Sequence, residues 1–200
     1  MATDMKGRKL IFSHLGVSCF DIGKMKAFYI DVMGMCESDS GHIDRGEGLD
    51  IAFLTTDPND HHQFVLASGR ADSHVETSPV IGGSVGQRIF QISFRLDSLA
   101  SLRSVLARYE AHGLTNFTPV NHGNAWAVYT RDIEGNPVEL FVDSPWYVNQ
   151  PCGLPLDLSK SDEEILAETE AYCQAQPEVE PYAAWSARMH DRIVAHQASI

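Results

Sequence analysis

The chain has 200 residues, a formal net charge of -12 and an apolar fraction of 44%. This length suits one domain, or two small modules that share a core. The acidic balance excludes a surface that follows nucleic-acid phosphates, but it does not exclude anionic small molecules, because the local field of a site can oppose the net charge.

The N-terminal part of the chain predicts one helix among short strands. Residues 10–20 alternate apolar and polar side chains as a strand does, and residues 24–32 place apolar side chains at helical spacing until Gly34. Further strands are predicted at residues 36–44, 51–54 and 62–67. The resulting order over about residues 10–68 is strand, helix, strand, strand, strand.

A similar pattern comes after a connector at residues 68–87, which is rich in Gly, Ser and Pro and shows no periodicity. Residues 88–96 predict a strand, and residues 98–112 predict a helix with one apolar face that Gly113 ends. The later strands of this half, joined by a tight turn at residues 132–136, are predicted at residues 124–130 and 136–143. The second module therefore covers about residues 88–143.

After Asp143 the composition changes. Three prolines predict an extended arm: Pro145, Pro151 and Pro155. Residues 159–174 predict a helix with acidic residues in its first turn, and residues 182–196 predict a last helix. This tail is too short for a core of its own, so we divide the chain into a domain at residues 1–145 and a C-terminal arm with helices at residues 146–200.

The same sequence spacing separates the two members of each of two pairs of polar residues, which lie in strand-like sequence. A shift of 77 residues takes Glu139 to His62, and the same shift takes Gln91 to His14. Glu139 is the one acid within the apolar run at residues 137–142, and a buried carboxylate is too costly to keep charged without partners. The repeat predicts a duplicated module whose two halves bury their sheets against each other.

These segments resemble the vicinal oxygen chelate superfamily, which includes glyoxalase I, bleomycin-resistance proteins and type I extradiol ring-cleaving dioxygenases. The resemblance covers about residues 10–145 and lies in Phe12-Ser13-His14-Leu15-Gly16-Val17, in Phe28-Tyr29, in Gly34 and in Asp132-Ile133-Glu134-Gly135-Asn136-Pro137-Val138-Glu139-Leu140. It implies an α+β fold in which paired βαβββ modules form a cupped, barrel-like mixed sheet, here with a C-terminal helical tail. Residues 143–147 also resemble the segment after the last strand in some dioxygenase-like members.

The resemblance implies a metal ion in the cup, held by the first strand of each module and the last strand of one or both. On this sequence these positions are His14, His62, Gln91 and Glu139. Extradiol dioxygenases use two histidines and one carboxylate, which leaves open positions on Fe(II) for a catechol and O2. Here His14 and Glu139 match, but Gln91 stands where the second histidine is expected, and its carbonyl is a harder and weaker ligand.

The resemblance also assigns three residues to the catalytic pocket. His62 matches a pocket histidine, Tyr129 matches a tyrosine that contacts substrate oxygens, and His122 lies near an acid/base histidine in a loop about two residues short. We therefore expect a non-haem Fe(II) dioxygenase that acts on an aromatic, catechol-like substrate with O2. Its metal ligands are expected to be His14, Gln91 and Glu139.

Two other functions stay open. In a glyoxalase-type isomerase or lyase, all four residues of the repeat would bind Zn(II), Ni(II), Mn(II) or Fe(II), and the metal would polarise vicinal oxygens without O2. In a metal-free protein of the bleomycin-resistance type, the cup would sequester a ligand. Gln91 is the residue that keeps both alternatives open.

The remaining expectations concern location and partners. The four cysteines include no CxxC pair, and the sequence shows neither an apolar signal segment nor a run long enough to span a bilayer. We expect a cytoplasmic protein with reduced thiols and no membrane or nucleic-acid partner. We also expect a homodimer or larger homo-oligomer, because the tail helices carry apolar residues whose faces need cover: Ile165, Leu166, Trp185 and Ile193.

Overall fold

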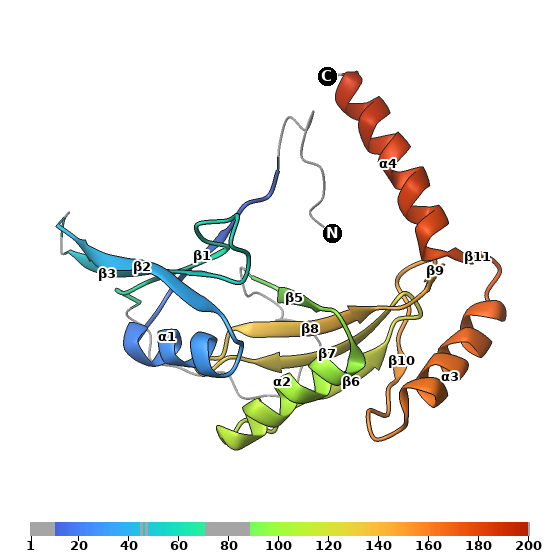
Figure 1. Ribbon diagram of the computed structural model, residues 1–200, viewed down its shortest axis with the longest axis horizontal. Helices are drawn as coiled ribbons and strands as arrows, with labels where there is room; N and C mark the ends of the chain where they lie inside the picture. Colours follow the sequence, from blue (N-terminus) through green and yellow to red (C-terminus); the bar gives the residue numbers. More distant parts are fainter. Residues whose placement is uncertain (1–10, 45, 47, 71–88, 200) are drawn as a thin grey trace.

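The computed structural model describes residues 11–44, 46, 48–70 and 89–199 (Figure 1). Most of the predicted connector, residues 71–87, lies outside these described residues. The first module consists of β1 (Leu15–Ser18), α1 (Ile22–Asp31), β2 (Cys36–Ile43), β3 (Leu49–Thr55) and β4 (Phe64–Ala67). Its sheet has the order β1-β4-β3-β2, in which β1 and β4 are parallel.

The second module repeats this arrangement. It consists of β5 (Ile92–Leu96), α2 (Leu99–Ala111), β6 (Thr118–Asn121), β7 (Ala125–Arg131) and β8 (Pro137–Asp143). Its strands have the order β6-β7-β8-β5, and β5 runs parallel to β8 as β1 does to β4. The predicted α+β fold of paired βαβββ modules is therefore confirmed, although β6 was not among the predicted strands.

Both helices are defined by local sequence signals. The Asp21 side chain accepts a hydrogen bond from the Lys24 backbone at the start of α1, and the Ser98 hydroxyl does the same for Ser101 at the start of α2. Gly34, with φ 78°, comes after α1 in the left-handed conformation that glycine adopts without strain. These signals explain why the predicted helix boundaries lie within two residues of those observed.

One hydrophobic core joins the two modules. It contains buried residues of α1, α2 and both sheets. The ring of Phe28 on α1 meets that of Tyr109 on α2 edge to face, with centroids 5.3 Å apart. In addition, Arg108 Nε donates to the Val32 carbonyl at 2.7 Å, so the two helices contact each other directly.

Buried carboxylates also connect the modules. Glu134, in the turn between β7 and β8, accepts hydrogen bonds from the backbone N–H groups of Phe20 and Asp21 at 2.8 and 2.7 Å. In the same turn, Asp132 accepts a hydrogen bond from the Tyr29 hydroxyl at 3.0 Å. The turn that carries the family resemblance thus holds the second module against the start of α1.

The C-terminal tail begins as part of the second module. It comprises β9 (Trp146–Val148), β10 (Leu154–Pro155), α3 (Asp162–Gln174), β11 (Val179–Pro181) and α4 (Tyr182–Ala198). Strand β10 extends the module-two sheet by pairing with β6, and β11 pairs with β9. Helix α3 starts with the capping box of Ser161 and Glu164, which confirms the predicted helix start with acidic residues.

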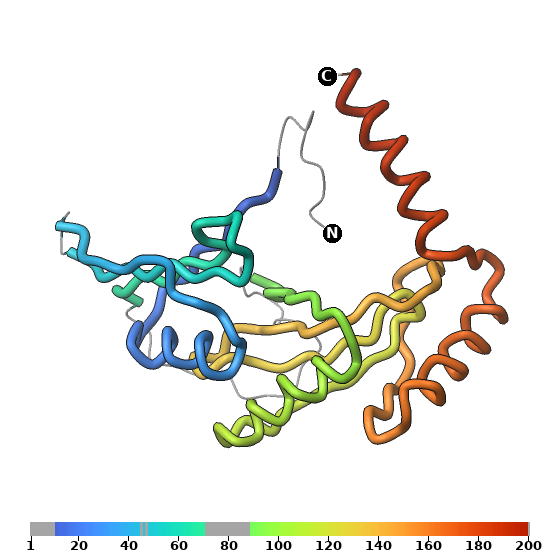
Figure 2. The backbone as a smooth tube through the Cα atoms, in the orientation of Figure 1, coloured from blue at the N-terminus to red at the C-terminus, as the bar shows by residue number. Residues whose placement is uncertain are grey.

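The two tail helices differ in how they are covered. Ile165 of α3 is buried, and Thr169 accepts hydrogen bonds from Asn121 and Trp126 at 2.8 Å each. Helix α4, in contrast, has no buried residue and extends away from the sheets (Figures 1 and 2).

The predicted homo-oligomer and the predicted division at residue 145 stay predictions. Within the described chain, no helix has the length and apolar character needed to cross a bilayer.

Candidate functional site

Each sheet has one face on the shared core and one face turned away from α1 and α2. In β8, alternate residues enter the core: Val138, Leu140 and Val142. Because neighbouring side chains of a strand point to opposite faces, Glu139 and Phe141 lie on the helix-free face. In β1, Val17 enters the core, which places His14 on the helix-free side of its own sheet.

The first module brings His14 and His62 together. Their ring centroids are 4.3 Å apart, and the His62 ring also lies 5.0 Å from that of Phe53. Partial burial and, to a lesser extent, the nearby His14 and His61 side chains lower the pKa of His62. A lowered pKa favours the neutral imidazole, which is the form that binds a metal or accepts a proton.

The second module brings Gln91 and Glu139 together. Glu139 is 8% exposed, and its Oε2 accepts hydrogen bonds from Gln91 Nε2 at 2.7 Å and from the Ser93 hydroxyl at 2.5 Å. Ser93 lies directly opposite Glu139 in the parallel pair of β5 and β8. Ser93 was not among the predicted site residues. Its position two residues after Gln91, hence on the same face of a strand, is the sequence signal that identifies it.

The contacts of Gln91 fix which way its amide group points. A carboxylate only accepts hydrogen bonds, so the amide nitrogen must face Glu139, and it also lies 2.9 Å from the Ser93 hydroxyl. The amide oxygen is then the Gln91 atom that is available to a cation. A carboxylate oxygen, an amide oxygen and neutral imidazoles are suitable donors for a divalent first-row metal ion.

His122 and Tyr129 form one hydrogen-bonded chain with Glu139. His122 Nδ1 lies 2.5 Å from the carbonyl oxygen of Cys152, which only accepts, so Nδ1 carries a proton. His122 Nε2 lies 3.0 Å from the Tyr129 hydroxyl, which is also within hydrogen-bond reach of Glu139. With Nδ1 protonated, the neutral ring accepts at Nε2, so the single hydroxyl proton goes either to His122 or to Glu139 at one time. Burial and, to a lesser extent, the charge of Glu139 raise the pKa of Tyr129, so the hydroxyl stays protonated at neutral pH.

The arm between β9 and β10 holds His122 in place. Gln150 Nε2 donates to the His122 carbonyl at 2.8 Å, and the Cys152 thiol donates to the same oxygen at 2.7 Å. Gln150 Oε1 in turn accepts a hydrogen bond from the Cys152 backbone N–H at 3.1 Å. Neither Gln150 nor Cys152 was predicted as a site residue, because the bonds join segments about 30 residues apart that show no common pattern.

The strand register corrects one part of the repeat. The shift of 77 residues relates β1 to β5, where Gly16 and Ser93 occupy equivalent positions. Gly16 pairs with Val65, whereas Ser93 pairs with Glu139, so the register counterpart of Glu139 is Val65 rather than His62. His62 precedes β4 and reaches the helix-free side from the loop before this strand. The apolar runs of β4 and β8 explain the false match, because such runs align equally well at several offsets.

The donor residues therefore lie in two pairs, one on each module. Across residues 11–44, 46, 48–70 and 89–199, no three His, Cys, Asp or Glu side chains lie close enough together to hold one metal ion.

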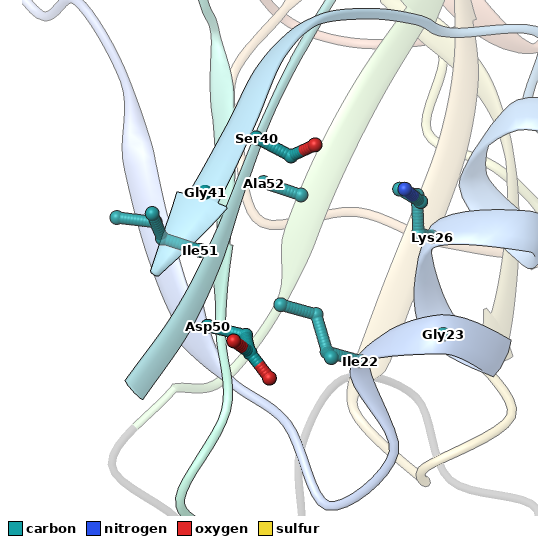
Figure 3. Close-up of a pocket in the computed structure, with 8 residues that line it drawn as sticks. All are labelled: Ile22, Gly23, Lys26, Ser40, Gly41, Asp50, Ile51 and Ala52. Carbon is teal, nitrogen blue, oxygen red and sulfur yellow. The ribbon is translucent and has the colours of Figure 1, made fainter. Parts of the chain in front are cut away.

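The described residues also form a pocket of about 270 Å³ between α1 and the β2–β3 hairpin (Figure 3). Lys26, Ser40 and Asp50 line this pocket, and none of the predicted site residues does.

Comparisons with known proteins identify the family. A family model for the Glyoxalase/Bleomycin resistance protein/Dioxygenase superfamily matches residues 11–140, which covers both modules. The chain belongs to this superfamily. The resemblance seen in the sequence is thus confirmed at the level of the family.

Individual relatives are more distant. Biphenyl-2,3-diol 1,2-dioxygenase 3 of Rhodococcus globerulus is 28% identical over 132 residues, which are 66% of this chain and 63% of the relative. The chain thus matches less than two thirds of this relative's length. A glyoxylase/bleomycin resistance protein/dioxygenase domain from Frankia sp. EAN1pec is similar in structure, with a TM-score of 0.52 and 19% identity over 66% of this chain and 95% of that chain.

A third similar protein is the fosfomycin resistance protein FosX from Listeria monocytogenes, whose structure is a complex with Mn(II) and sulfate. It has a TM-score of 0.47 and 18% identity over 66% of this chain and 91% of that chain. The description of the matching family names glyoxalases, bleomycin resistance proteins and dioxygenases together, so membership alone does not define the reaction of this chain.

Proposed function

We propose that this protein is a metal-dependent dioxygenase-like enzyme that acts on an aromatic substrate with vicinal oxygens, of the catechol type, and consumes O2. The observation that carries the proposal is the row of His122, Tyr129 and Glu139, in which the Tyr129 hydroxyl can donate its proton to either neighbour. It places an imidazole and a phenol, both able to move protons, beside a carboxylate suited to a metal ion. The identity to a biphenyl-2,3-diol dioxygenase supports the same reaction class.

In this proposal His14, the Gln91 amide oxygen and Glu139 hold the metal, and Fe(II) is the expected ion. The donor chemistry fits such an ion, since Glu139 is buried and its described hydrogen-bond donors are neutral: Gln91, Ser93 and Tyr129. When bound, Fe(II) supplies a binding place for the vicinal oxygens and for O2, together with the redox chemistry of ring cleavage.

The protein's own residues move protons around that centre. The Tyr129 hydroxyl donates to a substrate oxygen or to Glu139, and His122 Nε2 can accept a proton from this hydroxyl while Nδ1 stays bonded to the Cys152 carbonyl. His62, whose lowered pKa favours the neutral ring, accepts a proton from the substrate on the module-one side.

One observation favours a second candidate. The Gln91 side chain, which a two-histidine iron site does not use, hydrogen-bonds directly to Glu139 with its oxygen left for a cation. An amide ligand suits a metal that acts as a Lewis acid, as in a glyoxalase-type isomerase or lyase. This candidate uses the same residues but consumes no O2.

The test begins with the metal. Metal-free protein is loaded without oxygen with Fe(II), Mn(II), Zn(II) or Ni(II), and the bound metal is measured by elemental analysis. Oxygen uptake is then measured on a panel of catechols. We expect about one Fe(II) per chain, with uptake and a yellow ring-fission product only in the iron-loaded protein.

Three variants make the test specific. His14→Ala and Glu139→Ala should lose both the metal and the oxygen uptake, whereas His190→Ala, on exposed α4, should retain both. Bound metal without oxygen uptake on any catechol would contradict the dioxygenase and favour the isomerase or lyase. A protein that binds none of the four metals would leave the ligand-sequestering alternative.

A further inference from the structure

A cation lies on the same face as the candidate metal ligands. Arg95 comes two residues after Ser93 on β5, so both side chains point to the helix-free face, and Arg95 pairs with Phe141 of β8. The spacing of alternate residues along a strand puts the Cα atom of Arg95 about 7 Å beyond that of Ser93, the residue opposite Glu139. Arg95 is thus one side-chain step further along the same surface.

Two neighbouring side chains orient the guanidinium group of Arg95. It lies over the Phe141 ring, 5.4 Å from the centroid, and Nε lies 3.3 Å from Asp143 Oδ2. The ion pair with Asp143 is formed through Nε, which leaves the two terminal nitrogens as further donors. The Arg95 side chain is 63% exposed, so these nitrogens are accessible from solvent. Such a pair of N–H groups matches the two oxygens of a carboxylate.

Apolar and aromatic side chains lie beside Arg95 on this face. Phe141 packs with a small buried cluster on the helix-free face: Val120, Ala127 and Tyr129. At the far end, Tyr182 at the start of α4 lies near Asp143 and Arg95, and its pKa is raised by burial and, to a lesser extent, by the charge of Asp143. The face therefore has a polar group at Glu139 and, one side-chain step along the strands, the Arg95 cation over the ring of Phe141.

We propose that Arg95 determines specificity by binding a carboxylate group on the substrate, so that the substrate class is an anionic catechol that carries a carboxylate on its ring or on a short side chain. This inference rests on the proposed function, because it assumes that the vicinal oxygens bind beside Glu139. Phe141 then supports the aromatic ring. Asp143 holds the guanidinium through Nε, and the terminal nitrogens are the donors that would bind the carboxylate.

This arrangement also fits the charge of the whole chain. A protein with a net charge of -12 repels anions in general, so an anionic substrate requires a local cation. The paired Arg95 and Asp143 contribute no net charge, and a divalent ion beside Glu139 would make this face positive. A carboxylated catechol would then meet the metal ion at one end of the face and the N–H donors of Arg95 at the other.

The test measures binding rather than turnover. Protein loaded with Zn(II) is titrated by calorimetry with catechol, 3,4-dihydroxybenzoate and 3,4-dihydroxyphenylacetate. We expect at least one carboxylated catechol to bind about tenfold or more tightly than catechol, a preference that corresponds to about 1.4 kcal/mol. Arg95→Gln should bring this ratio close to one, and Arg95→Lys should give an intermediate ratio because it keeps the charge but loses the paired donors.

The control variant is Arg188→Gln, which removes an exposed cation of α4 that pairs with Glu180, and it should keep the full preference. The inference is overturned if the wild-type ratio is near one, or if Arg95→Gln retains the preference while its circular dichroism is unchanged. Oxygen uptake on catechol, together with no binding preference for carboxylated catechols, would overturn this inference but leave the proposed function intact. If catechol itself does not bind, but phenylacetate binds in an Arg95-dependent manner, the proposed function fails and the carboxylate site stands.

Discussion

At the scale of single residues, Gln91 is the residue in which the candidate metal site differs from the expected two-histidine site. Gln91 donates to Glu139 and Ser93 through its nitrogen, so it positions the carboxylate as well as offering an oxygen. An imidazole at this position would bind iron more strongly than an amide oxygen does. If Gln91 is a ligand of the proposed metal site, it gives up metal affinity for a fixed orientation of Glu139.

This exchange can be measured with Gln91→His. We expect the affinity for Fe(II) to rise on the order of tenfold, because two imidazoles and one carboxylate suit Fe(II) better than one imidazole, one amide and one carboxylate. Equilibrium dialysis under nitrogen measures the change. Gln174→His, at the exposed end of α3, is the control and should leave the affinity as it is. An unchanged affinity in Gln91→His would show that residue 91 is not a ligand.

The residues of the site differ in how well the sequence predicts them. Gln91 and Glu139 stand out as polar residues beside or within apolar runs, and the structure places them in contact. Ser93 was missed because its contact with Glu139 depends on the pairing of β5 with β8, which is 46 residues away in sequence. The repeat suggested His62 as the counterpart of Glu139, and the strand register shows that this match was wrong.

At the scale of elements, the sequence predicted the long helices and most strands of the modules. Caps and apolar periodicity are local signals, and they determine α1, α2 and α3. The elements that were missed are short strands, each of which contains or adjoins a proline: β6, β9, β10 and β11. Such strands form because a neighbouring strand offers its backbone groups, so their own residues carry little signal.

The predicted arm, which joins two of these missed strands, contributes to the candidate site because its residues between β9 and β10 hold His122. We expect Gln150→Ala to weaken this hold, since it removes the bonds from Gln150 to the His122 carbonyl and to the Cys152 backbone. The free energy of unfolding should fall by about 1 kcal/mol. Nitrogen NMR of the His122 ring should change from one tautomer, protonated at Nδ1, to a mixture.

A matched control for this variant is Gln176→Ala, which removes a similar bond from a glutamine side chain to the Tyr172 carbonyl. It should cost similar stability and leave the His122 ring spectrum unchanged. If Gln150→Ala lowers the stability but the ring keeps its Nδ1 proton, the arm is a structural support and not a positioning element for His122.

At the scale of the whole molecule, the two modules depend on each other through the turn at residues 132–136. Burial raises the pKa of Asp132, and hydrogen bonds from Asn136 and Tyr29 act in the opposite direction. A carboxyl with a raised folded-state pKa favours folding when it is protonated, so this contribution is complete below the unfolded-state pKa. It is lost as the pH rises through the folded-state pKa.

Tyr29→Phe tests this coupling between the modules. The variant leaves the buried Asp132 without the hydroxyl donor, so we expect a loss of about 1–3 kcal/mol in the free energy of unfolding at neutral pH. The loss should be smaller at about pH 4 than at about pH 8, because the tyrosine hydroxyl stabilises the ionised carboxylate. Urea unfolding at both pH values measures it. Tyr147→Phe, whose hydroxyl contacts only exposed Asn149 among the described residues, is the control. A loss that does not change with pH would contradict a role for Asp132 ionisation.

The placement of the donor pairs on separate modules has an evolutionary consequence. Each half folds its own donors onto a surface that the common core does not touch, so a ligand can be exchanged in one half while the other half and the packing stay intact. The fold therefore allows the chemistry to change by single substitutions in one of its two modules. Gln91, in place of the histidine that the resemblance led us to expect, is an exchange of this kind.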